Sequence, residues 1–399
     1  MQAATRQDQD KSNDVPWSVS DLPGLKPHML LPRGAGKESF FPFDKSSTHY
    51  FYFARNAIYA LIKHWQLSDQ QILFPSYFHG VELEALLAAG ARLQFYPVDR
   101  YMQVDPDQLE ALITPETKAV YMIHYLGFPG PIEKLRDICR ERNLKLIEDC
   151  ALALLSSLGN KPLGTFGDAS VFCLYKTLPV PNGGALVLTD EHARFETDPA
   201  PRRAAWSNVV SSLIQYYDRH GNFLARGALN NARKIAKTAV RAAKTEWVGV
   251  GGQHFEIERV KLGMNRLNFR ILKGQNYQQI IARRRHNYEY LLQSLGTLSE
   301  PVFHHLPEGV CPLFYPLRVP HGKSEFYDTL REQGVGVINF WLYPHECLPE
   351  GQFPQSDELR RTILELPCHQ DLNDDDMAKI VDIVKLQWEL KYDSSVTTL

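Results

Sequence analysis

Four short apolar segments of the sequence end in residues that could take part in chemistry. The residues that end them are Ser76-Tyr77-Phe78-His79, His124-Tyr125, Glu148-Asp149 and Tyr175-Lys176. In an open parallel sheet, ligands bind beyond the carboxyl ends of the strands, so these residues would meet at one edge. An amine, a carboxylate and flat rings together suit a planar electrophilic cofactor. Such a cofactor needs a group to attach it, an anion at its ring nitrogen, a surface against its ring and donors for its phosphate.

Lys176 is the candidate for the attaching amine. It directly follows the apolar run 171–175 (VFCLY) and is the only lysine between Lys161 and Lys234. Partial desolvation at a strand end favours the neutral, nucleophilic amine that Schiff-base chemistry requires. The alternative is a surface lysine in a turn, because lysines often end strands.

Asp149 is the candidate for the anion at the ring nitrogen. It ends the segment 145–149 (KLIED), which has the apolar character of a buried strand. A carboxylate beside a pyridine nitrogen keeps that nitrogen protonated, and the protonated ring can stabilise a carbanion. The sequence equally allows a strand-terminal acid that caps a helix or pairs with an arginine.

The segments that must position these residues alternate between strand and helix patterns. Apolar runs predict strands at 71–74, 93–98, 119–124, 145–147, 169–175 and 184–188. Helical spacing predicts helices at 54–65, 81–89, 105–112 and 132–143. This alternation indicates an α/β fold with a mostly parallel central sheet, and right-handed crossovers would place helices on both of its faces.

The rest of the chain suggests three parts. Residues 1–40 read as a loosely structured arm, 41–260 as a large domain and 261–399 as a small C-terminal α+β domain. In the small domain we expect strands at 314–319, 335–340 and 363–366 and helices at 280–295, 323–333 and 374–390. The large domain includes a basic insertion at about 200–250, with no acidic residue from 226 to 245. This insertion is either a solvated helical face or a surface for an anionic substrate or a polar partner.

Bulk properties exclude several classes of protein. The net charge of −2 gives no reason to expect nucleic-acid binding, and no binding module accompanies the basic insertion. No apolar run has the length that a membrane-spanning helix needs, and the N-terminus resembles neither a secretory signal nor a transit peptide. Six widely spaced cysteines without a CxxC pair match no metal site and suggest reduced thiols. We therefore expect a cytoplasmic protein without a metal and without a membrane or nucleic-acid partner.

Several motifs in the same order resemble one family. The segment 147–190 (IEDCALALLSSLGNKPLGTFGDASVFCLYKTLPVPNGGALVLTD) resembles the core of the DegT/DnrJ/StrS-type sugar aminotransferases. That core contains IEDAAQ and GxxGSFGDAxxFSF segments and a lysine before a GG turn. Residues 75–99 (PSYFHGVELEALLAAGARLQFYPVD) and 105–129 (DPDQLEALITPETKAVYMIHYLGFP) are also similar to the family, and 280–295 and 363–385 more weakly.

The resemblance implies a pyridoxal-phosphate (PLP) transferase of fold type I. Lys176 would attach PLP, and Asp149 would pair with its pyridine nitrogen. Such an enzyme moves an amino group from an amino acid, usually glutamate, to a keto group of a nucleotide-linked sugar in polysaccharide or secondary-metabolite biosynthesis. Another PLP reaction, a non-sugar carbonyl substrate and a non-catalytic paralogue that serves as a subunit or scaffold are the alternatives. A dehydratase is less favoured, because dehydratases of this fold carry a histidine in place of the lysine.

The resemblance also implies the other contacts to the cofactor. His79 stands where the family has an aromatic residue stacked on the ring, although a buried structural histidine is an alternative. Ala54, Arg55 and Asn56 stand at the helix start where the family binds phosphate. Backbone N–H groups at a helix N-terminus bind phosphate, and an arginine can add a charge-assisted bond. A capping Asn56 with a solvated Arg55 is the other interpretation.

In the family, an asparagine reaches the phosphate across the interface of a homodimer, and Asn265 and Asn268 are both candidates. Three departures from the family pattern suggest an outlying branch. Leu152 replaces a glutamine, Cys173 replaces a phosphate-binding serine, and Lys176 comes two residues sooner than usual. These departures put the substrate in doubt more than the cofactor.

Overall fold

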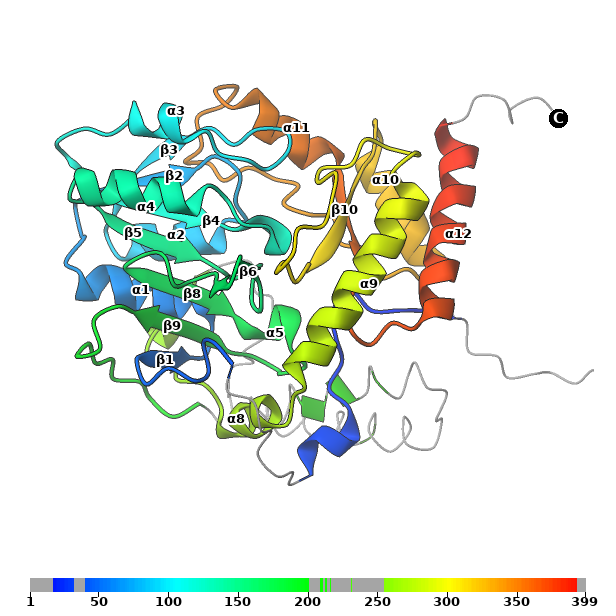
Figure 1. Ribbon diagram of the computed structural model, residues 1–399, viewed down its shortest axis with the longest axis horizontal. Helices are drawn as coiled ribbons and strands as arrows, with labels where there is room; N and C mark the ends of the chain where they lie inside the picture. Colours follow the sequence, from blue (N-terminus) through cyan, green and yellow to red (C-terminus); the bar gives the residue numbers. More distant parts are fainter. Residues whose placement is uncertain are drawn as a thin grey trace, which may run out of the picture.

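A computed structural model of the chain describes residues 17–31, 40–200 and 255–392, and a few residues between 201 and 254. The predicted basic insertion and most of the first 40 residues lie outside the described part. The centre of the molecule is a seven-stranded sheet with the strand order β1-β9-β8-β5-β4-β2-β3 (Figure 1). Its strands are β1 Thr48–Phe51, β2 Gln71–Pro75, β3 Arg92–Tyr96, β4 Thr117–Ile123, β5 Lys145–Asp149, β8 Ala169–Cys173 and β9 Gly184–Leu188.

The sheet is mostly parallel, as predicted. Strands β8, β5, β4, β2 and β3 pair in parallel, whereas β9 runs antiparallel to both of its neighbours, β8 and β1. Helices α1 and α2 pack together on one face, and α3 and α4 lie on the other (Figure 1). The helices that accompany the sheet are α1 Ala54–His64, α2 Val81–Ala88, α3 Pro106–Glu110, α4 Ile132–Glu141, α5 Leu174–Thr177, α8 Arg266–Lys273 and the 3₁₀ turns η2 Tyr125–Gly127 and η3 Ile257–Arg259.

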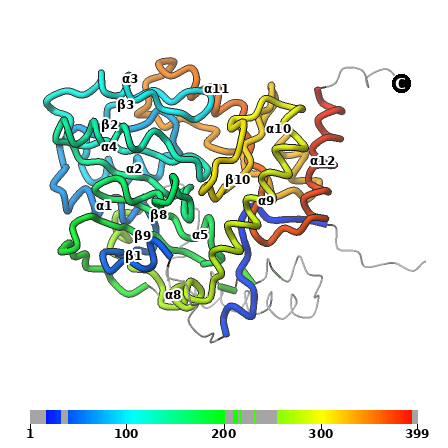
Figure 2. The backbone as a smooth tube through the Cα atoms, viewed as in Figure 1, coloured from blue at the N-terminus to red at the C-terminus, as the bar shows by residue number. Residues whose placement is uncertain are grey.

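The C-terminal elements form a second layer beside the carboxyl edge of the sheet. An antiparallel pair of strands is covered by helices, and α12 packs on α9 and α10 (Figures 1 and 2). These elements are α9 Tyr277–Leu295, β10 Phe314–Arg318, α10 Lys323–Glu332, α11 Pro354–Thr362, β11 Ile363–Pro367 and α12 Asp374–Tyr392. Within the ranges given above, none of the helices combines the length and apolarity needed to cross a bilayer. The domain boundaries at about residues 40 and 260 stay predictions.

The described part of the N-terminal arm packs along the C-terminal elements. Val19 donates its backbone N–H to the carbonyl of Gly334 at 2.9 Å, and the indole of Trp17 donates to Asp376 at 3.2 Å. The arm then forms the short 3₁₀ turn η1 Pro27–Leu30, where its chain passes near α8 (Figure 2). A side chain at Gly336 would collide with the arm's backbone at residues 20–21.

Two predicted strands are wrong in part. The strand expected at 335–340 is absent, and Ile338 makes only an isolated bridge with Glu365. The contact with the arm at Gly336 and a left-handed Trp341 (φ 42°) take this segment out of the sheet. The strand expected at 169–175 ends at Cys173, so Lys176 lies in the short helix α5 rather than at a strand end. The sequence analysis also missed β1, α8, α11 and the hairpin of β6 Ser157–Leu158 and β7 Lys161–Pro162.

A buried carboxylate joins the end of β5 to the loop that precedes β8. Glu148 is fully buried, and its Oε1 accepts the backbone N–H groups of Phe166 at 2.7 Å and Gly167 at 2.6 Å. Its Oε2 accepts the N–H of Gly164 at 2.8 Å and faces Nε2 of His124 at 3.1 Å. Both carboxylate oxygens are therefore fully used by this scaffold.

His124, Glu148 and Cys150 lie close enough together for their donor atoms to share a metal ion. However, Nδ1 of His124 accepts the N–H of Gly130 at 3.1 Å, which leaves the ring proton on Nε2 to be donated to Glu148. The imidazole and the carboxylate are thus committed to hydrogen bonds that hold the backbone. We interpret the cluster as structural.

We predict that Glu148→Gln destabilises the protein by about 2–4 kcal/mol, because it leaves a buried N–H of Gly164 unpaired and sets two donors against each other at His124. Urea unfolding measures the loss. The exposed Glu308→Gln is the matched control and should change stability by less than about 0.5 kcal/mol. Equal stabilities of the two variants would contradict the role of Glu148.

Candidate active site

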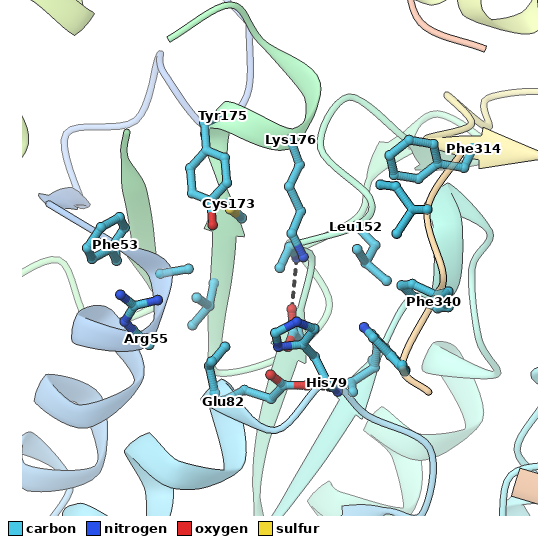
Figure 3. A pocket seen from close by; sticks show the side chains of 18 of the residues that line it. Phe53, Arg55, His79, Glu82, Leu152, Cys173, Tyr175, Lys176, Phe314 and Phe340 are labelled. Carbon is cyan, nitrogen blue, oxygen red and sulfur yellow. Dashed lines mark hydrogen bonds between the residues drawn. The ribbon is translucent and has the colours of Figure 1, made fainter. Parts of the chain in front are cut away.

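A cavity of about 260 Å³ lies at the carboxyl edge of the sheet, between the sheet and the C-terminal elements. Side chains from the start of α1, the loop after β2, the end of β5, helix α5 and the segment 338–341 line it (Figure 3). The candidates Lys176, Asp149, His79, Arg55 and Ala54 all belong to this lining. The structure therefore brings together residues that are far apart in the sequence.

Lys176 extends from helix α5 into the cavity (Figure 3). The turn that carries it is held at its end, because the carbonyl of Thr177 accepts from Arg284 at 3.2 Å and from the amide of Gln370 at 3.0 Å. Both of these donors come from the C-terminal part of the chain, and Arg284 is almost fully buried. A one-turn helix is not stable alone, so these contacts must fix the position of the lysine.

Asp149 presents a buried carboxylate to the same cavity. Its Oδ2 accepts the hydroxyl of Tyr121 at 2.6 Å, and its Oδ1 accepts the backbone N–H of Ala151 at 2.8 Å. Burial, helped by the negative charge of Glu82, raises the pKa of Asp149 to about 6, although the two hydrogen bonds and the charge of Lys176 oppose the shift. The carboxylate is thus mainly ionised at neutral pH.

His79 lies in the loop after β2 and follows the strand end as predicted. Its backbone N–H donates to Oε1 of Glu82 at 2.7 Å, and its ring lies edge-on to Trp341 with 6.4 Å between centroids. Burial lowers the pKa of His79 to about 4, and the positive charges of Lys176 and Arg55 add to this shift. The imidazole is therefore neutral at pH 7, which suits a ring that stacks on a cofactor.

Ala54 and Arg55, at the start of α1, also line the cavity. The guanidinium of Arg55 lies over the ring of Phe53 at 4.1 Å from its centroid, with both side chains on the same wall (Figure 3). Asn56 was expected to contact the phosphate together with Ala54 and Arg55, but it is not part of the lining. Its amide donates instead to the carbonyl of Arg259 at 2.9 Å. That contact agrees with a structural role.

Neither candidate asparagine of the later segment lines the cavity within one chain. Asn268 is fully buried, and its amide donates to the carbonyl and side-chain oxygens of Asn182 at 2.8 and 2.6 Å. Asn265 is only half-buried and caps α8 by accepting the N–H of Leu267 at 3.0 Å. Of the two, Asn265 is the one that is partly exposed.

Tyr175 was expected at the edge of the sheet together with Lys176, but no role was assigned to it. Its side chain lines the cavity together with that of Cys173, on the side of the cavity nearer Arg55 (Figure 3). The signal was present in the sequence, since the shortened loop places a hydroxyl group directly before Lys176.

The sequence analysis missed the wall formed by the C-terminal part. It consists of Phe314, Ile338, Phe340 and Trp341, together with the carboxyl of Glu365. The rings of Phe340 and Trp341 are stacked, with centroids 4.1 Å apart. Arg360 attaches this wall to the loop after β2, because its guanidinium donates to the carbonyls of Phe78, Trp341 and Ser76 at 3.0–3.2 Å.

A mostly parallel sheet with a lysine and a buried carboxylate at its carboxyl edge defines a PLP-dependent transferase of fold type I. The model of the DegT/DnrJ/EryC1/StrS aminotransferase family matches residues 56–197 and 269–385. The chain belongs to this family of PLP-dependent sugar aminotransferases, and its cofactor is PLP.

Curated relatives and solved structures agree with this membership. The chain is 38% identical to a dTDP-4-dehydro-2,3,6-trideoxy-D-glucose 4-aminotransferase from Saccharopolyspora spinosa, over 78% of this chain and 76% of the relative. It is 34% identical to a dTDP-3-amino-3,4,6-trideoxy-alpha-D-glucose transaminase from Micromonospora megalomicea, over 79% and 78%. The aminotransferase TlmJ from Streptoalloteichus hindustanus shares the fold with a TM-score of 0.62, at 22% identity and over 86% and 85% of the two chains.

The shift at Asp149 predicts a pH dependence of folding for the apoprotein. A carboxyl whose folded-state pKa is raised from 3.8 to about 6 stabilises the fold at low pH, and this contribution is lost as pH rises from about 4 to 6. The stability of wild type minus that of Asp149→Asn should therefore fall by up to about 3 kcal/mol between pH 4 and 7. Urea unfolding across this range measures it, with the exposed Asp328→Asn as control. If the unfolding free energies of wild type and Asp149→Asn changed with pH in the same way, the raised pKa of Asp149 would be disproved.

Proposed function

We propose that this protein transfers an amino group from glutamate to the keto group of a nucleotide-linked deoxysugar. The observation that carries the proposal is that Lys176 and Asp149 line one cavity with the neutral ring of His79. The two curated relatives described above act on dTDP-linked trideoxy sugars, which supports an acceptor of this class. The fold alone would not identify the reaction as a transamination. A dehydratase, the GDP-4-keto-6-deoxy-D-mannose-3-dehydratase of E. coli, matches the fold with a TM-score of 0.60.

The residues of the cavity fit PLP. The amine of Lys176 would attach the cofactor, Asp149 would face its pyridine nitrogen and His79 would lie against its ring. The N-terminus of α1, Arg55 and Tyr175 would receive the phosphate, because free backbone N–H groups, a guanidinium and a hydroxyl are all anion donors. When bound, PLP supplies an electron sink that stabilises a carbanion at the α-carbon of the amino acid.

The chain's own groups perform the proton transfers. Asp149, ionised above pH 6, holds a proton at the ring nitrogen. Nζ of Lys176 would serve as the base that removes the α-proton of the donor and as the acid that returns it. Phe340 and Leu152 exclude water from this region, since both side chains are buried and line the cavity. The acceptor half-reaction uses the same groups in the reverse order.

Assembly and location are part of the proposal. We place the enzyme in the cytoplasm, in keeping with six free cysteines, five of which are buried. We also propose a homodimer, in which the partly exposed Asn265 approaches the phosphate of the partner's cofactor. The buried Asn268 would instead hold Asn182 and the turn that leads into β9.

We predict that Lys176→Ala abolishes amination, lowering kcat by at least about 10³-fold, because no other amine lines the cavity among the described residues. Turnover is measured with glutamate and a panel of dTDP-linked keto sugars. Wild type should be yellow, and borohydride should fix the cofactor on Lys176. Unchanged activity in the variant would refute the role. A colourless wild type that takes up no PLP would favour a non-catalytic subunit, the reading that Leu152 and Cys173 support.

Tyr175→Phe tests the phosphate site without relying on activity. Loss of one hydroxyl donor to a charged acceptor should weaken PLP binding to the apoprotein about 10-fold, while binding of pyridoxal, which lacks the phosphate, stays the same. Fluorescence titration with both compounds measures the difference, and Tyr290→Phe on α9 is the control. An equal loss for PLP and pyridoxal would assign Tyr175 to the ring instead.

A further inference from the structure

Glu365 is a buried acid in the cavity with no role in the steps described so far. It lies in β11 with only 1% of its surface exposed, and its carboxyl belongs to the cavity lining. Its Oε1 is buried and has no hydrogen-bond partner within the described part of the chain. Burial raises the pKa of Glu365 well above its ordinary value, against the charges of Lys176 and Lys323. Burial therefore favours the protonated form of this carboxyl.

The neighbouring charges do not satisfy this carboxyl. Nζ of Lys323 donates instead to the carbonyls of Phe340 at 2.8 Å and Arg360 at 2.7 Å. Asp21 in the N-terminal arm repels the charged form of Glu365. An unpaired buried oxygen is costly, and one that lines a cavity can be satisfied by a group of the bound ligand. The arrangement therefore indicates a ligand group that bonds to Glu365.

The surroundings of Glu365 favour the sugar over the amino acid as that ligand. Phe314, Ile338, Phe340 and Trp341 line the same cavity as Glu365 and offer apolar surface that suits the C–H faces of a sugar ring. Glutamate carries two carboxylates, which call for cationic partners rather than another acid. Trp341 also holds a left-handed backbone conformation (φ 42°), and such strain often occurs where a binding site requires it.

We propose that Glu365 determines acceptor specificity by hydrogen-bonding one hydroxyl of the keto sugar, while the aromatic wall receives its deoxygenated edge. The assignment rests on the proposed transamination. It predicts a substrate with few hydroxyl groups, one of which faces β11. A sugar that lacks this hydroxyl would leave the carboxyl unpaired in a site from which water has been displaced, and such sites discriminate strongly.

The test compares Glu365→Met and Glu365→Gln with wild type on dTDP-linked 4-keto-6-deoxyglucose and its 2-deoxy and 3-deoxy counterparts. The two half-reactions are followed separately through the absorbance of the bound cofactor. Glu365→Met, which keeps the volume but removes the hydrogen bond, should lower kcat/KM about 50-fold for sugars that carry the recognised hydroxyl. It should lower kcat/KM by less than about threefold for the sugar without it. Glu365→Gln should restore most of the loss, and the exposed Glu332→Met should behave like wild type.

Stability separates this role from a structural one. Because the carboxyl has an unpaired oxygen when no sugar is bound, Glu365→Met should keep or raise the melting temperature, by about 1–3 °C. A lower melting temperature, a slower reaction with glutamate, or an equal loss for every sugar would overturn the assignment while leaving the proposed function in place. A wild-type enzyme that aminates none of the sugars would overturn both.

Discussion

An ionised carboxylate kept inside an apolar cavity is the constraint on which this structure depends. In the proposed mechanism Asp149 must stay charged to hold a proton on the cofactor's nitrogen, yet burial raises its pKa to about 6. The hydroxyl of Tyr121 and the N–H of Ala151 keep the charged form accessible by donating to both of its oxygens. Its neighbour Glu148 uses its oxygens for the loop before β8 instead. Consecutive residues of a strand point to opposite faces of the sheet. Of these two adjacent acids, one can therefore hold the backbone of a loop while the other faces the cavity.

Buried arginines connect the two halves of the site to that carboxylate. Arg284 on α9 holds the carbonyl that ends α5, and Arg360 on α11 holds the carbonyls around His79 and Trp341. Arg360 also lies over the rings of Tyr77 and Phe78, 5.3 Å from each centroid. Guanidinium groups suit this task because one side chain offers five donors in a fixed plane. The positions of the lysine and the imidazole thus depend on contacts from the C-terminal part.

This dependence explains what the sequence could and could not predict. Asp149, His79 and Arg55 each follow a local pattern, a strand end or a helix start, Lys176 follows an apolar run, and the structure places all four on one cavity. Helix α5 and the segment around Trp341 have no such pattern, since distant carbonyl contacts and the arm at Gly336 determine them. An apolar run therefore predicted a strand at 335–340 where the chain makes a single bridge. The alternation of apolar runs and helical spacing, by contrast, was enough for the sheet.

The residues near the proposed cofactor site follow local sequence patterns, whereas those near the proposed acceptor site do not. The cofactor's contacts come from the sheet and the elements directly attached to it, where the resemblance to the family is strong and local motifs are informative. The wall that would meet the acceptor comes from segments 314, 338–341 and 365, which join the cavity only through folding. A sugar has no charge at its reacting end and is recognised by shape, C–H contacts and a few hydroxyl groups, which leave no motif in a sequence. Leu152, in place of the family's glutamine, adds to the apolar surface of the cavity. The residues proposed to carry the chemistry therefore follow local sequence patterns, whereas the residues proposed to select the acceptor come together only through folding.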